Sequence, residues 1–548
     1  MTQATPTSSA TRTVTGLHAG RTTSAWHKPR SPGAPLRADV ATDVVVVGGG
    51  ITGLTTAWLL AKRGARVVVV DDGPIGSGET ERTTAHLASA LDERFVHLEK
   101  LHGKDNARLA AQSHAQAIDQ IEAIVRELQI DCDFQRVDGY LFAADVTDSD
   151  DTDLDDECAA AVRAGLVAEV VDAIPSLPRL GRAVRFANQA EFEPMRYLHA
   201  LALACEARGV LLCTNTHADQ IEGGAAPKVV TDEGFTISAT KAVVVATNTP
   251  VNDILALHTK QLPYRSYAIG LRVAAGSLPH ALWWDTADPY HYVRLMRGVD
   301  DNAGHDVLIV GGEDHKTGQV DDATERFDLL EAWARERFVV GARVSEWSGQ
   351  VMEPIDGLAF IGKNPMDHDN VYVATGDSGH GLTHGTIAGM MLSEMIFGVD
   401  DHPWAALYDP RRKSLQGITD YAKESFNVAV QYARWLKGSD VPHDEDIPRG
   451  SGAVQRRGLS LVAVSVDDDG CRHECSAVCP HLGAIVAWND LEKSWDCPLH
   501  GSRFTPTGAV MNGPTNKGLE RLGDVAPALP DVSDEEATRP IPIWADRK

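Results

Sequence analysis

The chain has 548 residues, 43% of them hydrophobic and 23% charged, so it is long enough for two to four domains with ordinary globular cores. Its formal net charge of −26 argues against nucleic acid and anionic membrane surfaces as partners. No apolar run approaches the ~20 residues of a membrane span, and the Ser/Thr-rich N-terminus lacks the apolar centre of a secretory signal. We therefore expect no membrane insertion and a cytoplasmic location, where cysteines are thiols or metal ligands.

The first ordered unit is expected to begin after a polar stretch. Residues 1–39 are rich in Ser, Thr, Pro and Gly, which predicts a flexible N-terminal arm. A β-branched run at 43–47 leads into GGGITGLTTAWLLAKRG (48–64), which has the pattern of a helix with basic residues and a glycine at its end. A second β-branched run at 66–70 ends in two aspartates. This order is typical of the opening unit of a Rossmann-type fold.

The glycine turn between the first strand and the helix predicts a dinucleotide site. Gly48 would allow the tight turn, Gly50 would let a pyrophosphate approach the backbone, and Gly53 would let helix and strand pack closely. Asp71, about twenty residues further on, would accept a hydrogen bond from a ribose hydroxyl. The alternative is a glycine-rich turn without a ligand. The motif alone does not choose between FAD and NAD.

The remainder of the chain divides into three parts. Helical periodicity covers 96–129, the acidic stretch 145–157 is expected to be a solvated loop, and strand signals recur at 242–246, 307–310 and 371–374. We predict an oxidoreductase domain over 40–405, a helical linker over 406–443 that includes an amphipathic stretch at 421–438, and a small β domain over 444–548.

Several segments resemble the D-amino-acid oxidase-like superfamily of FAD enzymes, which includes glycine oxidase, sarcosine oxidase and dimethylglycine dehydrogenase. They are the dinucleotide segment, GSGETERTTAHLA (76–88), the segment at 191–212, VVVATNTP (243–250) and ATGDSGHGLTHGTIAGMMLSEMIFG (374–398). The resemblance spans about 43–398. It implies an α/β fold, in which a Rossmann-type FAD domain is interleaved with an α+β substrate domain.

The same resemblance implies which residues bind FAD. The late glycine loop would lie against the flavin ring, and the 76–88 segment would line its phosphate and flavin side; with Thr52 in the glycine turn, these residues are Ser77, Thr83, Thr84, Gly376, Gly379, Gly381, Leu382 and Thr383. Thr84-Ala85-His86 resembles the context in which dimethylglycine dehydrogenases attach FAD covalently to a histidine. The alternative is that His86 only donates or accepts hydrogen bonds near the flavin.

The C-terminal part contains four metal-ligating side chains. Cys479 and His481 are separated by fifteen residues from Cys497 and His500, which is the ligand spacing of a Rieske [2Fe-2S] centre, with two thiolates on one iron and two imidazoles on the other. The segments CPHLG, CPLHGSRF and MNGP (511–514) resemble those of Rieske domains, in which Pro514 would belong to a loop that covers the cluster. A Cys2His2 zinc site is the structural alternative.

Three departures from many respiratory Rieske proteins stand out. Ala484 and Leu499 occupy the places of two further cysteines, so the corresponding disulfide is absent, and Phe504 replaces a tyrosine that donates to a cluster sulfur, while Ser502 is retained. One hydrogen bond fewer predicts a low or intermediate reduction potential. Cys471 and Cys475 are expected to be ordinary thiols rather than alternative ligands or a redox pair.

The combination resembles a bacterial family of Rieske-bearing FAD oxidoreductases. It implies oxidation of a C–N bond in a small amine or amino acid, hydride transfer to the flavin, and passage of electrons through the cluster to an external one-electron carrier. Candidate catalytic residues are Arg265, Tyr292, Arg294 and His380, with Tyr264, His291 and His384 also considered. Two alternatives stay open: a ferredoxin-like partner that sends electrons from cluster to flavin, and a non-enzymatic redox-sensing module.

Overall fold

The structure is a computed structural model. It describes residues 19–26, 31–144, 148–252, 257–298, 304–320, 322–365, 367–399, 401–413, 431, 433–436, 438–441 and 447–525. Just over half of the predicted linker, including two thirds of the amphipathic stretch at 421–438, lies outside the described residues.

A parallel sheet of β-branched strands positions the dinucleotide turn. β1 (Val40–Val47) pairs in parallel with β2 (Val67–Val70) on one side and with β10 (Thr236–Val245) on the other. Both faces are covered, so the four residues of β2 are all buried valines. The order is β16-β17-β10-β1-β2-β7. The other strands of this sheet are β7 (Leu211–Cys213), β8 (Ala218–Glu222), β9 (Lys228–Thr231), β16 (Phe360–Lys363) and β17 (Val371–Thr375).

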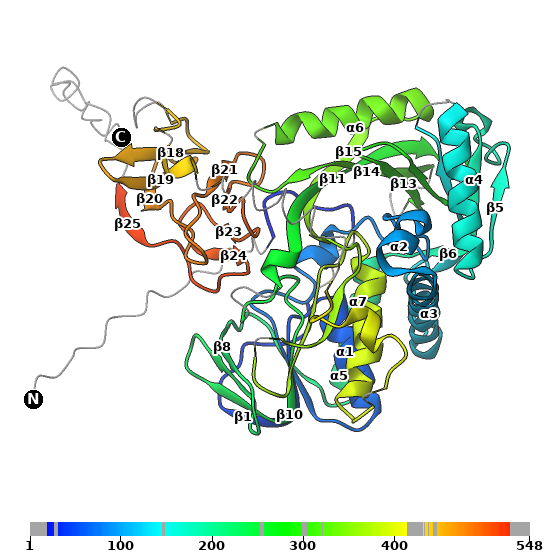
Figure 1. Cartoon of the computed structure of the whole chain (residues 1–548). Helices are drawn as coiled ribbons and strands as arrows, with labels where there is room; N and C mark the ends of the chain where they lie inside the picture. The colour runs from blue at the N-terminus through cyan, green and yellow to red at the C-terminus, as the bar shows by residue number, and fades with distance from the viewer. Residues whose placement is uncertain are drawn as a thin grey trace, which may run out of the picture.

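Helices cover this sheet, and two of them approach very closely. α1 (Ile51–Lys62) and α7 (Gly381–Met395) lie side by side in Figure 1, with α5 (Pro194–Ala207) beside α1 and α3 (Lys104–Leu128) beside α7. A Cβ on Gly385 would lie 2.6 Å from Thr52 Oγ1, and a Cβ on Gly389 would lie 2.7 Å from Thr55 Cγ2. The two glycines, one turn apart, therefore permit this helix contact.

A second, nine-stranded sheet is interleaved with the first along the chain. Its order is β15-β11-β14-β13-β12-β4-β6-β3, and β5 pairs with β6. α6 (Ala323–Arg337) covers one face through Phe327, Leu330 and Trp333. The strands are β3 (His86–Leu87), β4 (Gln135–Phe142), β5 (Ala168–Val171), β6 (Ala183–Glu191), β11 (Gln261–Ala274), β12 (Leu282–Asp285), β13 (His291–Met296), β14 (His305–Lys316) and β15 (Arg343–Pro354).

The C-terminal part is a β domain that lies at one side of the molecule (Figure 1). One four-stranded sheet has the order β18-β19-β20-β25, and the other β21-β22-β23-β24. Their bounds are β18 (Ser451–Arg457), β19 (Ser460–Val466), β20 (Arg472–Ser476), β21 (Ala487–Asn489), β22 (Ser494–Asp496), β23 (Arg503–Phe504), β24 (Val510–Asn512) and β25 (Arg521–Val525). The predicted fold class, an interleaved α/β domain followed by an all-β domain, is confirmed.

Two local expectations differ from the structure. Within the predicted flexible arm, residues 19–26 are packed: Trp26 is buried and its Nε1 donates to the Thr83 carbonyl at 2.7 Å. The acidic stretch is helical from Asp148 onward, where α4 (Asp148–Arg163) begins. Glu157 in this helix accepts hydrogen bonds from the first backbone N–H groups of α2 (Phe95–His102). An acid at a helix N-terminus is stabilised there by the unpaired N–H donors.

Among the described residues, no helix combines the length and the apolar character needed to cross a bilayer.

Candidate active site and cluster site

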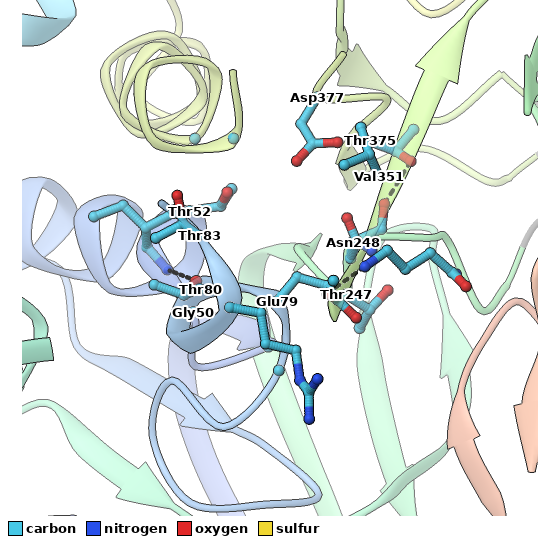
Figure 2. Close-up of a pocket in the computed structure, with 18 of the residues that line it drawn as sticks. Gly50, Thr52, Glu79, Thr80, Thr83, Thr247, Asn248, Val351, Thr375 and Asp377 are labelled. Atoms are coloured by element: carbon cyan, nitrogen blue, oxygen red, sulfur yellow. Dashed lines mark hydrogen bonds between the residues drawn. The ribbon is translucent and has the colours of Figure 1, made fainter. Parts of the chain in front are cut away.

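A cavity of about 310 Å³ opens at the carboxyl ends of the parallel strands, the usual ligand position in such sheets. Figure 2 shows Gly50 and Thr52 facing Thr375 and Asp377 across its open centre. The C-terminal domain contributes to the same wall through Val510–Gly513, Thr515 and Asn516. Two parts of the chain therefore enclose one cavity.

The glycine turn has the geometry that a phosphate cradle needs. Gly48 has φ +110°, and a Cβ there would lie 2.2 Å from the Ala246 carbonyl oxygen. A Cβ on Gly53 would lie 1.8 Å from the Gly48 carbonyl oxygen, so only glycine lets α1 start this close to the turn. Gly50 is the N-cap of α1, whose first N–H groups provide donors for phosphate oxygens.

Asp71 lies at the end of β2 on the cavity wall. Its two carboxylate oxygens accept from the backbone N–H groups of Gly49 and Gly73, at 2.6 and 2.8 Å. Burial and the neighbouring Asp72 raise the pKa of Asp71 to about 7. Each oxygen keeps a second lone pair, so the side chain still fits the predicted role of accepting from a ribose hydroxyl.

Most of the residues predicted to bind FAD line this cavity. The structure brings together Gly48, Gly50, Thr52, Asp71, Ser77, Thr83, Thr84, His86, Gly376, Gly379, Gly381 and Leu382. The Ser77 hydroxyl has no hydrogen-bond partner among the described residues, which leaves it for a bound group. Gly53 acts through helix packing instead, and Thr383 lies away from the cavity with its Oγ1 2.9 Å from His114 Nδ1.

His86 lies on the cavity wall with both ring nitrogens in contact. Nε2 is 3.2 Å from the Val293 carbonyl, which can only accept, so this nitrogen carries the proton and Nδ1 accepts from Thr84 Oγ1 at 3.2 Å. Burial and the nearby Arg294 lower the pKa of His86 to about 4. Both ring nitrogens of His86 already take part in hydrogen bonds, so neither is available for a covalent bond to FAD. The geometry therefore favours a histidine that is only hydrogen-bonded near the flavin. We expect acid precipitation to leave the flavin in the supernatant; flavin that stays with the pellet would contradict this.

Two candidate catalytic residues lie in the cavity. Tyr292 donates to or accepts from Ser266 Oγ at 2.6 Å, and burial raises the pKa of its phenol. His380, the N-cap of α7, has Nε2 3.4 Å from Asp92 Oδ1. Burial acts to lower the pKa of His380, but the Asp92 carboxylate outweighs it and leaves that pKa raised. His384 also lines the cavity, and burial together with His380 lowers its pKa to about 3.

The two candidate arginines lie elsewhere, which corrects the expectation that they meet substrate. Arg265 is buried against Ser348 and against Glu492 of the C-terminal domain, with Nη2 3.2 Å from Glu492 Oε1. Arg294 donates to the carbonyls of Ala85 and Phe192. Neither lines the cavity. Tyr264 and His291 are also outside it, and His291 is bonded to Asp285. The sheet that carries these four residues was identified from the sequence, but not the group that each side chain contacts.

Four carboxylates that line the cavity were missed by the sequence analysis. They are Asp92, Asp314, Glu353 and Asp377. Burial raises the pKa of Asp314 to about 7, that of Asp377 to about 6, and that of Glu353 well above its usual range. Only Asp377, inside the late glycine loop, carried a local signal. The other three come from separate loops and strand ends.

The four predicted cluster ligands converge in the C-terminal domain. The rings of His481 and His500 have centroids 4.9 Å apart, and the sulfurs of Cys479 and Cys497 adjoin, which lowers the pKa of the first thiol and raises that of the second. His500 Nδ1 is buried without a hydrogen-bond partner among the described residues, and burial beside His481 lowers its pKa to about 3, leaving the neutral imidazole that iron binds.

The four ligands lie as two pairs, with the two thiols together and the two imidazoles together. In a Rieske centre, two protein ligands bind each of the two irons. All eight cysteines are free thiols, and Ser502 lies close enough to hydrogen-bond the Cys479 sulfur.

Comparison with known proteins decides the family. A family model described as FAD dependent oxidoreductase matches residues 43–395. The chain belongs to this family. A second model, the Rieske [2Fe-2S] domain, matches residues 437–523. The protein is thus an oxidoreductase whose cofactors are FAD and a Rieske [2Fe-2S] cluster.

Individual relatives agree with this assignment. YhfW of Bacillus subtilis (strain 168), named for a Rieske 2Fe-2S iron-sulfur centre, is 32% identical over 491 residues, covering 89% of this chain and 94% of its own. Gamma-glutamylputrescine oxidoreductase of Escherichia coli (strain K12) is 25% identical over 380 residues, 67% of this chain and 86% of that protein. The crystal structure of glycine oxidase from Geobacillus kaustophilus matches with a TM-score of 0.55 at 20% identity, covering 68% and 99% of the two chains, and so shares the fold.

Proposed function

We propose that this protein oxidises the C–N bond of a small cationic amine and passes the electrons through its Rieske cluster to an external one-electron carrier. The observation that carries the proposal is the composition of one cavity wall. The dinucleotide turn, a set of carboxylates and a loop of the Rieske domain all bound the same space of about 310 Å³.

The charges in the cavity support an amine rather than an amino acid. Asp92, Asp314, Glu353 and Asp377 face the space, whereas Arg82 is the one Lys or Arg among the described lining residues. The Arg82 guanidinium is already bonded to Thr22, the Ser348 carbonyl and Glu492. A substrate carboxylate would therefore lack the bidentate partner it needs, while an ammonium would meet several acceptors. The amine substrate implied by the name of the Escherichia coli relative is consistent with this.

The residues of the cavity would orient the amine and accept one proton from its nitrogen. When bound, FAD supplies an acceptor for the hydride that leaves the α carbon. An ammonium nitrogen must first lose one proton, so that departure of the hydride leaves an iminium ion; His380 paired with Asp92 is the candidate acceptor of that proton, with Tyr290 held by the same carboxylate at 2.9 Å. The iminium ion then hydrolyses to a carbonyl compound and the released amine.

The position of the Rieske domain supports electron passage within one chain. Asn512 donates to Glu79, and Gln350, on the cavity wall, donates to the Gly501 carbonyl beside His500 at 3.0 Å. Two electrons leave the substrate together and the cluster takes one at a time, so an external one-electron carrier must complete each turnover. The eight free cysteines agree with the cytoplasm as the compartment we propose.

An anaerobic panel of matched compounds tests the substrate assignment. Each amine or diamine is mixed with the purified holoprotein beside its α-carboxylated analogue, and flavin absorbance is followed. We expect the amine to bleach the flavin at far lower concentration than its carboxylated partner. Bleaching by the carboxylated partners instead would overturn the cationic assignment. If reduced ferredoxin bleaches the flavin and no amine does, electrons run from cluster to flavin.

A further inference from the structure

The histidine edge of the cluster site is covered by a third histidine from the flavin domain. His258 lies in η3 (His258–Lys260), the turn that precedes β11. Its ring centroid is 5.0 Å from that of His481 and 5.9 Å from that of His500. The side chain is 2% exposed, so this contact is buried. The three rings form a single aromatic group across the domain boundary.

The same turn connects directly to the wall of the flavin cavity. Gln261, three residues after His258, is buried, and its Oε1 accepts from Thr375 Oγ1 at 3.1 Å. Thr375 lines the cavity at the end of β17. A continuous series of packed groups thus runs from the cavity wall through Gln261 and the η3 turn to the edge of the cluster.

Two glycines let the loop that carries cluster ligands pack closely against the flavin domain. A Cβ on Gly501, the residue after His500, would lie 2.6 Å from Pro263 Cβ on β11. A Cβ on Gly318 would lie 3.0 Å from the Asp496 carbonyl oxygen. Gln319 also donates to the Pro498 carbonyl at 3.3 Å. This close fit holds the histidine edge against the flavin domain, with His500 buried and His481 partly exposed.

We propose that His258 is a positioning residue for electron transfer between flavin and cluster: its ring holds the His481 and His500 edge against the flavin domain and excludes water from it. One electron at a time would cross this contact from the reduced flavin to the oxidised cluster and leave for a one-electron carrier. That carrier must then approach the cluster by a face other than the covered histidine edge. The inference rests on the proposed function only for the direction of this flow.

The test compares His258→Ala, which removes the ring, with His258→Phe, which keeps an aromatic face. His402→Ala is the matched control, since His402 is a mostly covered histidine of the flavin domain that lines neither site. Iron and acid-labile sulfide are measured first. The flavin is then photoreduced with oxalate as the sacrificial electron donor and without any amine, and the rate at which the Rieske EPR signal appears is recorded with its g-values.

We expect His258→Ala to slow cluster reduction by about ten- to a hundredfold, the scale on which small misplacements of reacting groups act, and to shift the g-values. His258→Phe and His402→Ala should transfer at the wild-type rate. A wild-type rate and spectrum in His258→Ala would overturn the proposal, as would loss of the cluster in both His258 variants, which would make the role structural. Because light replaces the substrate, failure here is distinguishable from failure of the amine assignment.

Discussion

Under the proposed function, the carboxylates of the cavity select a cationic substrate. Asp314, Glu353 and Asp377 have pKa values raised by burial, so in the empty cavity their charged forms are disfavoured. An ammonium group would stabilise these charged forms and displace protons from the carboxyl groups. Binding of a cationic amine should therefore be coupled to deprotonation of the cavity.

This coupling predicts a pH dependence for amine binding. The pKa of Asp314 is about 7, so its carboxylate is ionised above that pH and neutral below it. The dissociation constant of the amine should rise as pH falls through about 7, because the acceptor charge is lost. Asp314→Asn should weaken binding at pH 8 and flatten the profile. Equilibrium titrations of flavin absorbance between pH 6 and 8 measure this, and an unchanged profile in the variant would refute it.

A second prediction at the scale of single residues concerns Ser502 and the reduction potential of the cluster. Its hydroxyl lies within hydrogen-bonding reach of the Cys479 sulfur, and Phe504 supplies no second hydroxyl. Ser502→Ala should lower the midpoint potential by about 40 mV, the one-electron equivalent of a hydrogen bond of about 1 kcal/mol. An EPR-monitored redox titration checks the shift. A midpoint that stays constant or rises would show that Ser502 does not donate to the cluster.

At the scale of elements, the contact between α1 and α7 places the dinucleotide turn opposite the late glycine loop. Gly389→Ala would put a Cβ 2.7 Å from Thr55 Cγ2 and 3.1 Å from the Thr55 carbonyl carbon. We expect a loss of about 1–3 kcal/mol in the free energy of unfolding, the usual cost of overpacking, and weaker FAD retention. Gly523→Ala, where no atom of the described residues lies within 4 Å of the added Cβ, is the control in a parallel denaturant series.

Local patterns predicted the elements that carry this contact. The strand, glycine turn and helix at 43–64 are adjacent in the chain, and the cluster ligands lie within 22 residues, so spacing alone was informative. Arg265 and Arg294 were assigned to the substrate because strand membership does not tell which distant group a side chain meets. Glu492, the partner of Arg265, is 227 residues away. His258 and the four cavity carboxylates were likewise brought together only by the fold.

At the scale of the whole molecule, one buried carboxylate joins three segments. Glu492 of the Rieske domain has a fully buried side chain and pairs with Arg82 and Arg265 at 3.2 Å each, while Thr22 from the N-terminal segment also donates to it. Burial acts to raise the pKa of Glu492, but these arginines and Arg503 outweigh it and lower the pKa to about 2. The pairing therefore holds the domain interface together at neutral pH.

Removing this charge should loosen the interface. Glu492→Gln leaves two buried guanidinium groups without their counter-ion, which typically costs about 3–5 kcal/mol. In the wild type the stabilisation is complete above the ordinary glutamate pKa of about 4.3 and is lost as pH falls toward 2, so the variant should lack this acid-dependent step. Thermal unfolding and limited proteolysis across this pH range measure it. Glu474→Gln, which removes a partly exposed ion pair within the Rieske domain, should change little, and equal effects would contradict the account.

The central claim is that one chain oxidises an amine at its flavin and delivers the electrons to its own cluster. The most direct measurement is freeze-quench EPR of the anaerobic holoprotein after mixing with an amine that bleaches the flavin, beside a variant that lacks the cluster ligand His500. The account predicts a Rieske signal that grows as the flavin reduces and that is absent from the variant. Flavin bleaching in the wild type with a cluster that stays oxidised would contradict it.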